Sequence, residues 1–360
     1  MTFEEMINIL PFSLKKSEKN ALLTQKLLSL TKEHILSCDK YSRMMRAIGY
    51  NQDKVTHYND IPFLPVNLFK EIELKSISDD EVFKITTSSG TTGQAVSKIY
   101  LDRATASMQQ KTLVKIVSDF IGEARMPMLI IDSPATIKDR TMFSARGAGI
   151  LGFSIFGADK VYALDNDMNL NFHAIEVFLE KHSSKRILLF GFTFMIWMHF
   201  YKELLEIDKK LNLSDAVLIH GGGWKKMLAQ SVTKEEFKHC LNDICSIKSI
   251  HDYYGMVEQT GSIYMECEHG NLHTSIFSDI ITRRHTDFSV CNFGEKGIIQ
   301  VVSVLPESYP GHSLLTEDEG VILGEDDCPC GRYGKYFEVA GRLKNAEIRG
   351  CSDTYAAQFN

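Results

Sequence analysis

Long runs of like charge and long apolar stretches are both missing from this sequence of 360 residues. The net charge is only −6, with no basic cluster, so we expect no nucleic-acid partner. The first ten residues, MTFEEMINIL, lack the lysines and arginines of a secretory signal. The longest apolar stretch, residues 187–200, is shorter than the about 20 residues of a membrane helix. We therefore expect a cytoplasmic protein without a membrane span.

The hydrophobic and charged fractions, 44% and 24%, are those of an ordinary globular protein, and the length suits about two domains. Residues 1–50 have helical apolar spacing. From about residue 81, apolar runs such as MPMLIID, RILLF and DAVLIH alternate with helical patterns, as in residues 104–120 and 171–182. This alternation predicts an α/β fold in which a mostly parallel sheet is covered by helices.

After about residue 270 the pattern changes to shorter strands without helices between them, for example GIIQVVSVL and YFEVAG. This pattern indicates a smaller β-rich subdomain. We therefore expect residues 1–270 to form a helical N-terminus and an α/β nucleotide-binding part, and residues 271–360 to form the β-rich part.

A loop of hydroxyls and glycines, TTSSGTTG at residues 86–93, follows the strand candidate EVFKI. Its glycines permit backbone conformations in which successive N–H groups converge on one anion. No Gly-Lys-Ser/Thr follows, so it is not a Walker loop. The alternative is a polar turn without function. We expect a triphosphate cradle formed by Thr87, Ser88, Ser89, Gly90, Thr91, Thr92 and Gly93.

Four stretches, in order along the chain, resemble motifs of the adenylate-forming superfamily. TSSGTTG resembles its phosphate loop, HGGGW its adenine-binding stretch, YYGMVE its tyrosine-glycine-x-x-glutamate motif, and GRLKNAEIRG its hinge. The resemblance implies ATP and Mg²⁺ as cofactors and the superfamily's N-terminal-domain fold. The chain ends ten residues after Gly350, so the resemblance also leads us to expect that the full C-terminal lid domain is absent.

The superfamily motifs also imply roles for single residues. Glu258 would hold magnesium, a role that suits a hard carboxylate ligand. Asp318, flanked by Glu317 and Glu319, would hold the ribose, and Arg342 would contact ribose or phosphate. Lys98 would replace the lysine that usually follows the loop. The stretches around the base would contribute Gly221, Gly222, Gly223, Tyr254 and Gly255.

Nearly the whole chain resembles the acyl-protein synthetase family of bacterial bioluminescence fatty-acid reductases, through LPFSLKKSEK, LPESYPGHSLLTED, CPCGRYGKYFEV and EIRGCSDT. The resemblance implies that a fatty acid becomes an acyl-adenylate and then a thioester on Cys351. An acyl-accepting reductase would be the partner. Arg349 would lower the pKa of this thiol. A small buried cysteine is the alternative.

Two other functions stay open. The chain could pass the acyl group to coenzyme A or a carrier protein, as ligases of the phenylacetate-CoA-ligase type do. Free coenzyme A would then strongly stimulate AMP release. It could also be a non-catalytic nucleotide-binding subunit of a reductase complex. All three functions share the same nucleotide motifs.

Two cysteine-containing stretches, Cys267-Glu268-His269 and Cys328-Pro329-Cys330, supply three thiols and an imidazole. Four such ligands suit a tetrahedral structural zinc site, provided the fold brings the stretches together. His273 is a possible substitute for His269. Free thiols in turns are the alternative.

Overall fold

The computed structural model describes residues 1–88, 96–137, 145–224 and 230–343. The chain divides into two compact units whose segments interleave in sequence. Among the described residues, the first comprises 1–88, 96–120 and 255–343, and the second comprises 121–137, 145–224 and 230–254. The boundary that we expected between residues 270 and 271 lies inside the first unit.

The first unit begins with helices and continues into a β-rich part. Its helices are α1 (Phe3–Met6), α2 (Lys16–Ser37), α3 (Asp39–Ala47), α4 (Leu68–Glu71) and α5 (Arg103–Ile121). Its strands are β1 (Leu64–Pro65), β2 (Lys84–Thr87), β3 (Lys98–Leu101), β9 (Tyr264–Glu266), β10 (Leu272–His273), β11 (Ser278–Arg283), β12 (Lys296–Ser303), β13 (Ser313–Glu325) and β14 (Lys335–Arg342).

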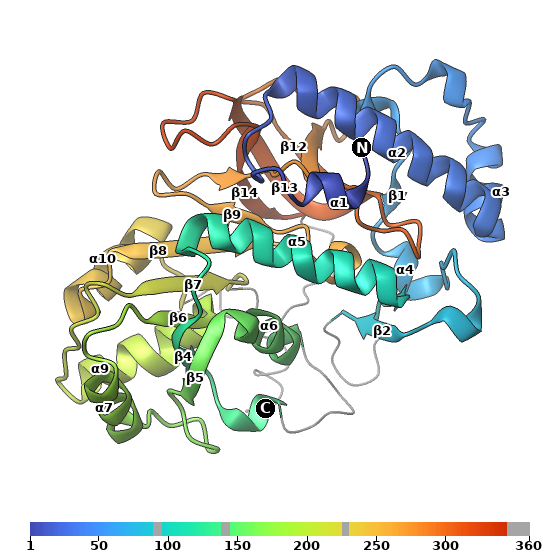
Figure 1. The fold of residues 1–360 in the computed structure, drawn as a ribbon. Coiled ribbons are helices and arrows are strands. Elements are labelled where there is room, and N and C mark those ends of the chain that lie inside the picture. Colours follow the sequence, from blue (N-terminus) through green and yellow to red (C-terminus); the bar gives the residue numbers. More distant parts are fainter. Residues whose placement is uncertain (89–95, 138–144, 225–229, 344–360) are drawn as a thin grey trace. The chain divides into compact units, whose positions relative to one another are not determined.

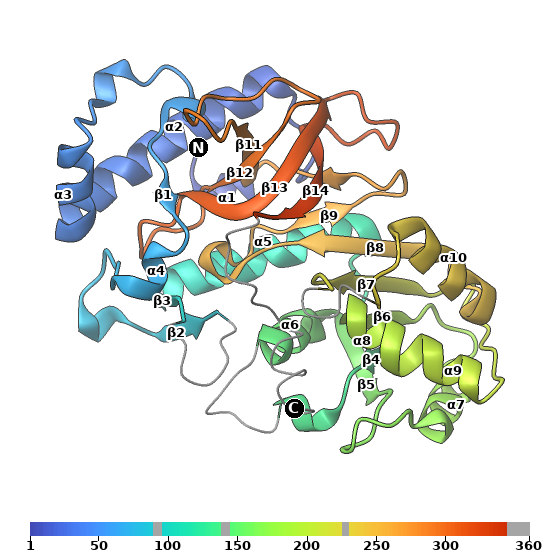
Figure 2. The same cartoon turned by 180° about the vertical axis from the view of Figure 1, so that it is seen from behind.

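The main sheet of this unit has the strand order β11-β12-β13-β14-β10-β9, with antiparallel neighbours. The short strand β1 adds to β13 in parallel, and β2 and β3 form a separate hairpin. Helix α2 runs along one face of the sheet (Figures 1 and 2). The apolar residues that it buries recur at helical spacing, and they are Leu22, Leu23, Leu27 and Leu30.

A buried ionic network joins α2 to the sheet. The Asp279 carboxylate on β11 lies 3.3 Å from Lys19 Nζ and 3.6 Å from Lys335 Nζ. The Tyr58 hydroxyl donates to Asp279 Oδ2 (2.9 Å) and accepts from Lys335 Nζ (2.9 Å). Lys19 also donates to Thr274 Oγ1 (2.7 Å). Because buried charges are tolerated only when they are paired, this network fixes how α2 packs on the sheet.

The second unit is an α/β layer structure. Its strands are β4 (Met126–Ile131), β5 (Gly157–Tyr162), β6 (Leu188–Phe192), β7 (Val217–Gly221) and β8 (Ser249–Tyr254). Its helices are α6 (Ala145–Phe153), α7 (Phe172–Lys181), α8 (Thr193–Ile196), α9 (Lys202–Glu206) and α10 (Lys234–Cys245). A π-helical turn at residues 197–201 joins α8 to α9.

The strands of the second unit pair in parallel in the order β5-β4-β6-β7-β8. One face carries Leu129, Leu189 and Leu218, which pack with apolar residues of α7 and α10. On the other face α6 lies against β6, where the rings of Phe153 and Phe190 stack at 4.5 Å. The predicted mostly parallel sheet covered by helices is therefore confirmed for this unit.

The apolar stretch at residues 187–200 forms β6 and continues into α8, and most of its side chains are buried. The stretch is therefore part of the core of the second unit. No helix among the described residues is both long enough and apolar enough to span a membrane.

Candidate functional site

Two serines of the first unit join the segments on either side of the loop that we expect to bind phosphate. Strand β2 ends at Thr87, whose register partner on β3 is Lys98. The Ser88 N–H donates to the Ser97 carbonyl (3.2 Å), and the Ser97 N–H donates to Ser88 Oγ (2.9 Å). The hairpin therefore fixes Thr87 and Ser88, whereas residues 89–95, which include Ser89, Gly90, Thr91, Thr92 and Gly93, lie outside the described residues.

Glu258 lies in a one-turn 3₁₀ helix (Val257–Gln259) and is buried. Its carbonyl accepts a hydrogen bond from the Tyr309 hydroxyl (2.8 Å), and Gln259 Nε2 donates to the Gly311 carbonyl (2.8 Å). Burial raises the pKa of the Glu258 carboxyl, while the Ser97 hydroxyl and the Lys70 ammonium act in the opposite direction. Glu258 is thus held beside Ser97, the residue that directly precedes β3.

Asp318 and Arg342 face each other on neighbouring strands. They are register partners on β13 and β14, and Arg342 Nε lies 3.5 Å from Asp318 Oδ1. Successive side chains of a strand point to opposite faces, so Glu317 and Glu319 point away from the face of Asp318. Glu319 pairs instead with Lys296 (3.1 Å) and His285 (2.9 Å). The structure therefore brings Asp318 and Arg342 together, but not the neighbouring glutamates.

The glycine-rich stretch lies in the second unit, where β7 ends. A side chain at Gly221 would collide with the Tyr253 ring, since an added Cβ would lie 2.4 Å from it. Gly222 has a φ of +79° and lies against Phe192, while Gly223 has open space beside it. Together with Tyr254 at the end of β8, these glycines lie at the carboxyl ends of parallel strands, where α/β sheets usually bind ligands.

His220 on β7 and His251 on β8 both have polar partners. His220 Nδ1 lies 2.9 Å from Thr193 Oγ1, and His251 Nε2 lies 3.0 Å from Ser249 Oγ.

Gly255 begins the next segment of the first unit, where an added Cβ would lie 3.2 Å from Ile263.

Three cysteines and one histidine form a compact cluster in the first unit. The ligand atoms of Cys267, His273, Cys328 and Cys330 all lie within 4.8 Å of one another. Cys267 Sγ lies 4.0 Å from Cys328 Sγ, and Cys330 Sγ lies 3.3 Å from His273 Nε2. The histidine is His273, the substitute considered from the sequence, whereas the exposed His269 is not part of the cluster.

Hairpin geometry explains why His273 joins the cluster. Cys267 directly follows β9, and His273 lies on β10, whose register partner on β14 is Tyr336. Cys328 and Cys330 lie in the turn between β13 and β14. Strand pairing therefore brings the β9–β10 hairpin to this turn.

The cluster suits a divalent metal of the zinc type. Zn–S bonds of about 2.3 Å give thiolate separations of about 3.8 Å in a tetrahedron, close to the observed sulfur–sulfur distance. Burial raises the pKa of the Cys267 thiol to about 12, whereas backbone N–H groups of Asn271 and His269 act in the opposite direction. The Asn271 side chain also donates to Cys328 Sγ (3.5 Å). Such N–H donors suit thiolates, the form of cysteine that binds metal.

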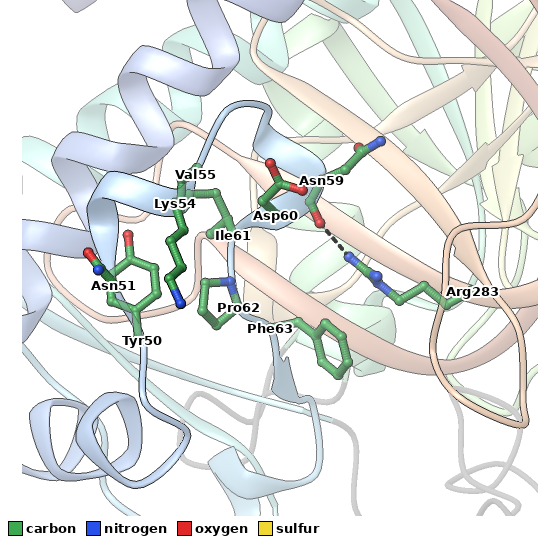
Figure 3. Close-up of a pocket in the computed structure, with 10 residues that line it drawn as sticks. All are labelled: Tyr50, Asn51, Lys54, Val55, Asn59, Asp60, Ile61, Pro62, Phe63 and Arg283. Carbon is green, nitrogen blue, oxygen red and sulfur yellow. Dashed lines mark hydrogen bonds between the residues drawn. The ribbon is translucent and has the colours of Figure 1, made fainter.

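A separate surface hollow of about 460 Å³ lies in the first unit (Figure 3). Arg283 Nη2 at its edge donates to the Asn59 carbonyl (2.7 Å), and the Lys54 side chain extends along its wall. None of the residues predicted from the sequence lines this hollow.

Comparison with known proteins identifies the family. The acyl-protein synthetase family, LuxE, matches residues 3–360. The chain belongs to this family. Membership places it among ligase-type enzymes, as the motifs predicted.

Two relatives are named long-chain-fatty-acid–luciferin-component ligase. The relative from Vibrio harveyi is 24% identical over 340 residues, which cover 91% of this chain and 85% of the relative. The relative from Aliivibrio fischeri is 23% identical over 326 residues, which cover 83% and 79% of the two chains.

A solved structure shares the fold. The open conformation of 2-hydroxyisobutyryl-CoA ligase, in complex with 2-HIB-AMP and CoA, aligns with a TM-score of 0.70 and 14% identity. The alignment covers 96% of this chain and 82% of that one. The predicted fold of adenylate-forming enzymes is thereby confirmed.

Sequence reasoning missed three residues around Glu258, namely Lys70, Ser97 and Tyr309. Lys70 lies far from the recognised motifs in the sequence, whereas Tyr309 lies within LPESYPGHSLLTED, a stretch that carried the family resemblance but no role for its tyrosine. Ser97 directly precedes Lys98, but a serine after a loop carries no signal of its own. Cys351 lies outside the described residues.

Proposed function

We propose that this chain uses Mg²⁺ and ATP to activate a fatty acid as its acyl-adenylate, and then carries the acyl group as a thioester on Cys351. The placement of Glu258 is the observation that supports the first step, activation of the acid. A buried carboxylate stands beside the paired serines that close a hydroxyl-rich loop. Family membership and the names of the two relatives support a fatty acid as the substrate.

In the first step, a carboxylate oxygen of the acid attacks the α-phosphorus of ATP. A bond forms between that oxygen and the phosphorus, the bond to the bridging oxygen breaks, and pyrophosphate leaves with the electron pair. Bound magnesium would neutralise phosphate charge. Glu258 would hold this cation, and the hairpin at Ser88 and Ser97 would orient the loop amides toward the phosphates.

The Asp318–Arg342 pair of the first unit would bind the ribose of the nucleotide. Asp318 can accept hydrogen bonds from ribose hydroxyls, while Arg342 holds its carboxylate in place and offers further donors to phosphate or ribose. The open backbone at Gly223 suits a flat base.

In the second step, the thiolate of Cys351 attacks the acyl carbon of the adenylate. A carbon–sulfur bond forms, the carbon–oxygen bond to AMP breaks, and AMP leaves with the electron pair while the thiol proton passes to solvent. An acyl-accepting reductase would be the partner that takes the acyl group from this thioester.

Zinc would play a structural part. Cys267, His273, Cys328 and Cys330 would supply four protein ligands, which leave no open position for substrate.

Intact-mass spectrometry tests the proposal. Wild type, Cys351→Ser and Cys240→Ser would each be incubated with Mg-ATP and carboxylic acids of different chain length. We expect a hydroxylamine-sensitive acyl adduct on wild type and on Cys240→Ser, whose half-buried cysteine lies outside the metal cluster. Cys351→Ser should form no adduct but keep acid-dependent pyrophosphate exchange.

Other outcomes would contradict the proposal. Steady AMP release that rises with coenzyme A or a carrier protein, without an adduct, would establish a ligase with a free thiol acceptor. Failure of every acid to support pyrophosphate exchange would overturn acid activation itself.

A second variant tests the role of Glu258. Glu258→Gln keeps the size of the side chain but removes the charge that would hold magnesium. We expect pyrophosphate exchange to fall by about 100-fold or more. Unchanged exchange at saturating magnesium would remove Glu258 from the site.

A further inference from the structure

The segment that precedes α4 lies beside the part of β13 that leads to Asp318. Leu64 and Pro65 pair in parallel with Leu314 and Leu315, and the Val66 N–H donates to the Leu315 carbonyl (2.9 Å). The short helix α4 (Leu68–Glu71) follows directly. Its position is therefore set by main-chain bonds to the strand that carries Asp318.

Helix α4 also packs against Tyr309, whose hydroxyl is hydrogen-bonded to the main chain of Glu258. Phe69 is buried, and its ring meets the Tyr309 ring edge to face at 6.0 Å. The Tyr309 hydroxyl donates to the Glu258 carbonyl at 2.8 Å. Lys70, the next residue, is half-buried. A half-buried lysine keeps its stem against the protein and carries its ammonium to the surface.

The negative charges around Glu258 favour a cation beside this carboxylate. Burial and the carboxylate of Glu317 both raise the pKa of Glu258, and the Lys70 ammonium opposes them. Binding ATP would bring several more negative charges next to these carboxylates. A magnesium ion offsets two of them, and a lysine is a compact point charge suited to phosphate oxygens.

We propose that Lys70 is a catalytic residue whose ammonium binds the phosphates of ATP beside Glu258. This inference rests on the proposed acid activation. The ammonium offsets the charge that develops as the acid oxygen bonds to the α-phosphorus and pyrophosphate leaves with the electron pair. No proton is transferred in this step, so Lys70 stays protonated throughout.

Lys98 is the competing candidate, because the sequence alone pointed to it. Lys98 is exposed and lies opposite Thr87 on the β2–β3 hairpin. The experiment therefore compares Lys70→Met, Lys70→Arg and Lys98→Met with Lys32→Met, which replaces an exposed lysine on α2. Each variant is assayed for acid-dependent pyrophosphate exchange at varied ATP and for unfolding in urea.

We expect Lys70→Met to lower kcat by about 100-fold, with a smaller change in KM for ATP, because the contact strengthens in the transition state. Lys70→Arg should retain part of the activity, and Lys32→Met should match wild type. Unfolding midpoints should not change.

Two results would overturn the proposal. One is exchange by Lys70→Met within threefold of wild type. The other is an equal loss in Lys70→Met and Lys70→Arg at unchanged stability, which would show that packing and not charge matters. Absence of exchange in wild type with every acid is a different result, since it refutes acid activation as a whole.

Discussion

Asp279 is a fully buried carboxylate that two lysines and a tyrosine surround. Burial acts to raise its pKa, but Lys19 and Lys335 hold it below the usual value. Asp279→Asn removes the negative charge and leaves two ammonium groups buried without it. We expect a loss of about 3–5 kcal/mol in the free energy of unfolding, measured in urea.

The matched control is Asp39→Asn, which breaks the exposed pair between Asp39 and Arg43 on α3. An exposed pair contributes about 0–1 kcal/mol, so this variant should unfold almost like wild type. If both variants lose the same small amount, the buried network does not stabilise the fold.

The metal cluster shows how far residue types alone can lead. Three cysteines in two short stretches indicated a four-ligand site, and the structure brings Cys267, Cys328 and Cys330 together. From the sequence we expected His269 as the fourth ligand and His273 only as its substitute, because both follow Cys267 within a few residues; the cluster contains His273 instead. The β9–β10 hairpin brings His273 into the cluster, because it turns the chain back after Cys267 and puts His273 on β10, the strand paired with β9.

At the scale of elements, the close approach of α5 to the segment after Glu258 depends on one glycine. Gly261 has a φ of +89°, and an added Cβ would lie 2.5 Å from the Gln109 carbonyl oxygen. We expect Gly261→Ala to cost about 2 kcal/mol or more of stability, since it adds backbone strain and a collision with helix backbone. Urea unfolding measures the loss.

Gly49→Ala is its control. Gly49 also has a positive φ, +66°, but no atom lies within 4 Å of the added Cβ. Strain alone should cost about 1 kcal/mol here. Equal losses in the two variants would show that α5 moves aside without penalty.

The stability of the β9–β10 hairpin and the β13–β14 turn should depend on a bound metal ion. We expect purified protein to bind about one equivalent of zinc, because four ligands complete a structural site. Removal by a chelator should lower Tm, since the free energy of metal binding contributes to folding. Metal content by mass spectrometry and thermal unfolding are the measurements.

Cys328→Ser should lose zinc and show the same reduced Tm without chelator. Cys240→Ser, a thiol on α10 outside the cluster, should keep both. A protein that carries no metal and whose Tm is insensitive to added zinc would contradict the assignment.

At the scale of the whole molecule, stability should fall at mildly acidic pH. Burial lowers the pKa of His34 from 6.5 to about 4, against the opposing effect of its hydrogen bond with the Pro306 carbonyl. The unfolded state therefore binds more protons between these values. Stability should be complete above about pH 6.5 and should fall by about 3 kcal/mol as pH approaches 4.

The buried ring of His312 stacks on His34 at 5.0 Å, and burial lowers its pKa in the same direction. Unfolding free energies measured from pH 4 to 8 test the predicted slope of stability against pH. His34→Gln should flatten it, whereas His239→Gln, at an exposed position, should leave it unchanged. A slope that His34→Gln does not alter would assign the pH dependence to other groups.

The sequence by itself determined the local elements and the kinds of chemistry. Apolar periodicity predicted the parallel strands and their helices, because burial of an apolar face depends on spacing that is visible in the chain. The ordered motifs pointed to Glu258, Asp318 and Arg342, because each requires a particular side chain at a particular place.

Only the tertiary structure decided which distant residues meet. It built each unit from segments that are distant in the sequence, paired Asp318 rather than Glu317 with Arg342, brought His273 into the metal cluster, and packed α4 against Tyr309, whose hydroxyl binds the Glu258 carbonyl. Such contacts join residues that are far apart in sequence. They depend on strand register and on burial of side chains from several elements at once, and a single local pattern records neither.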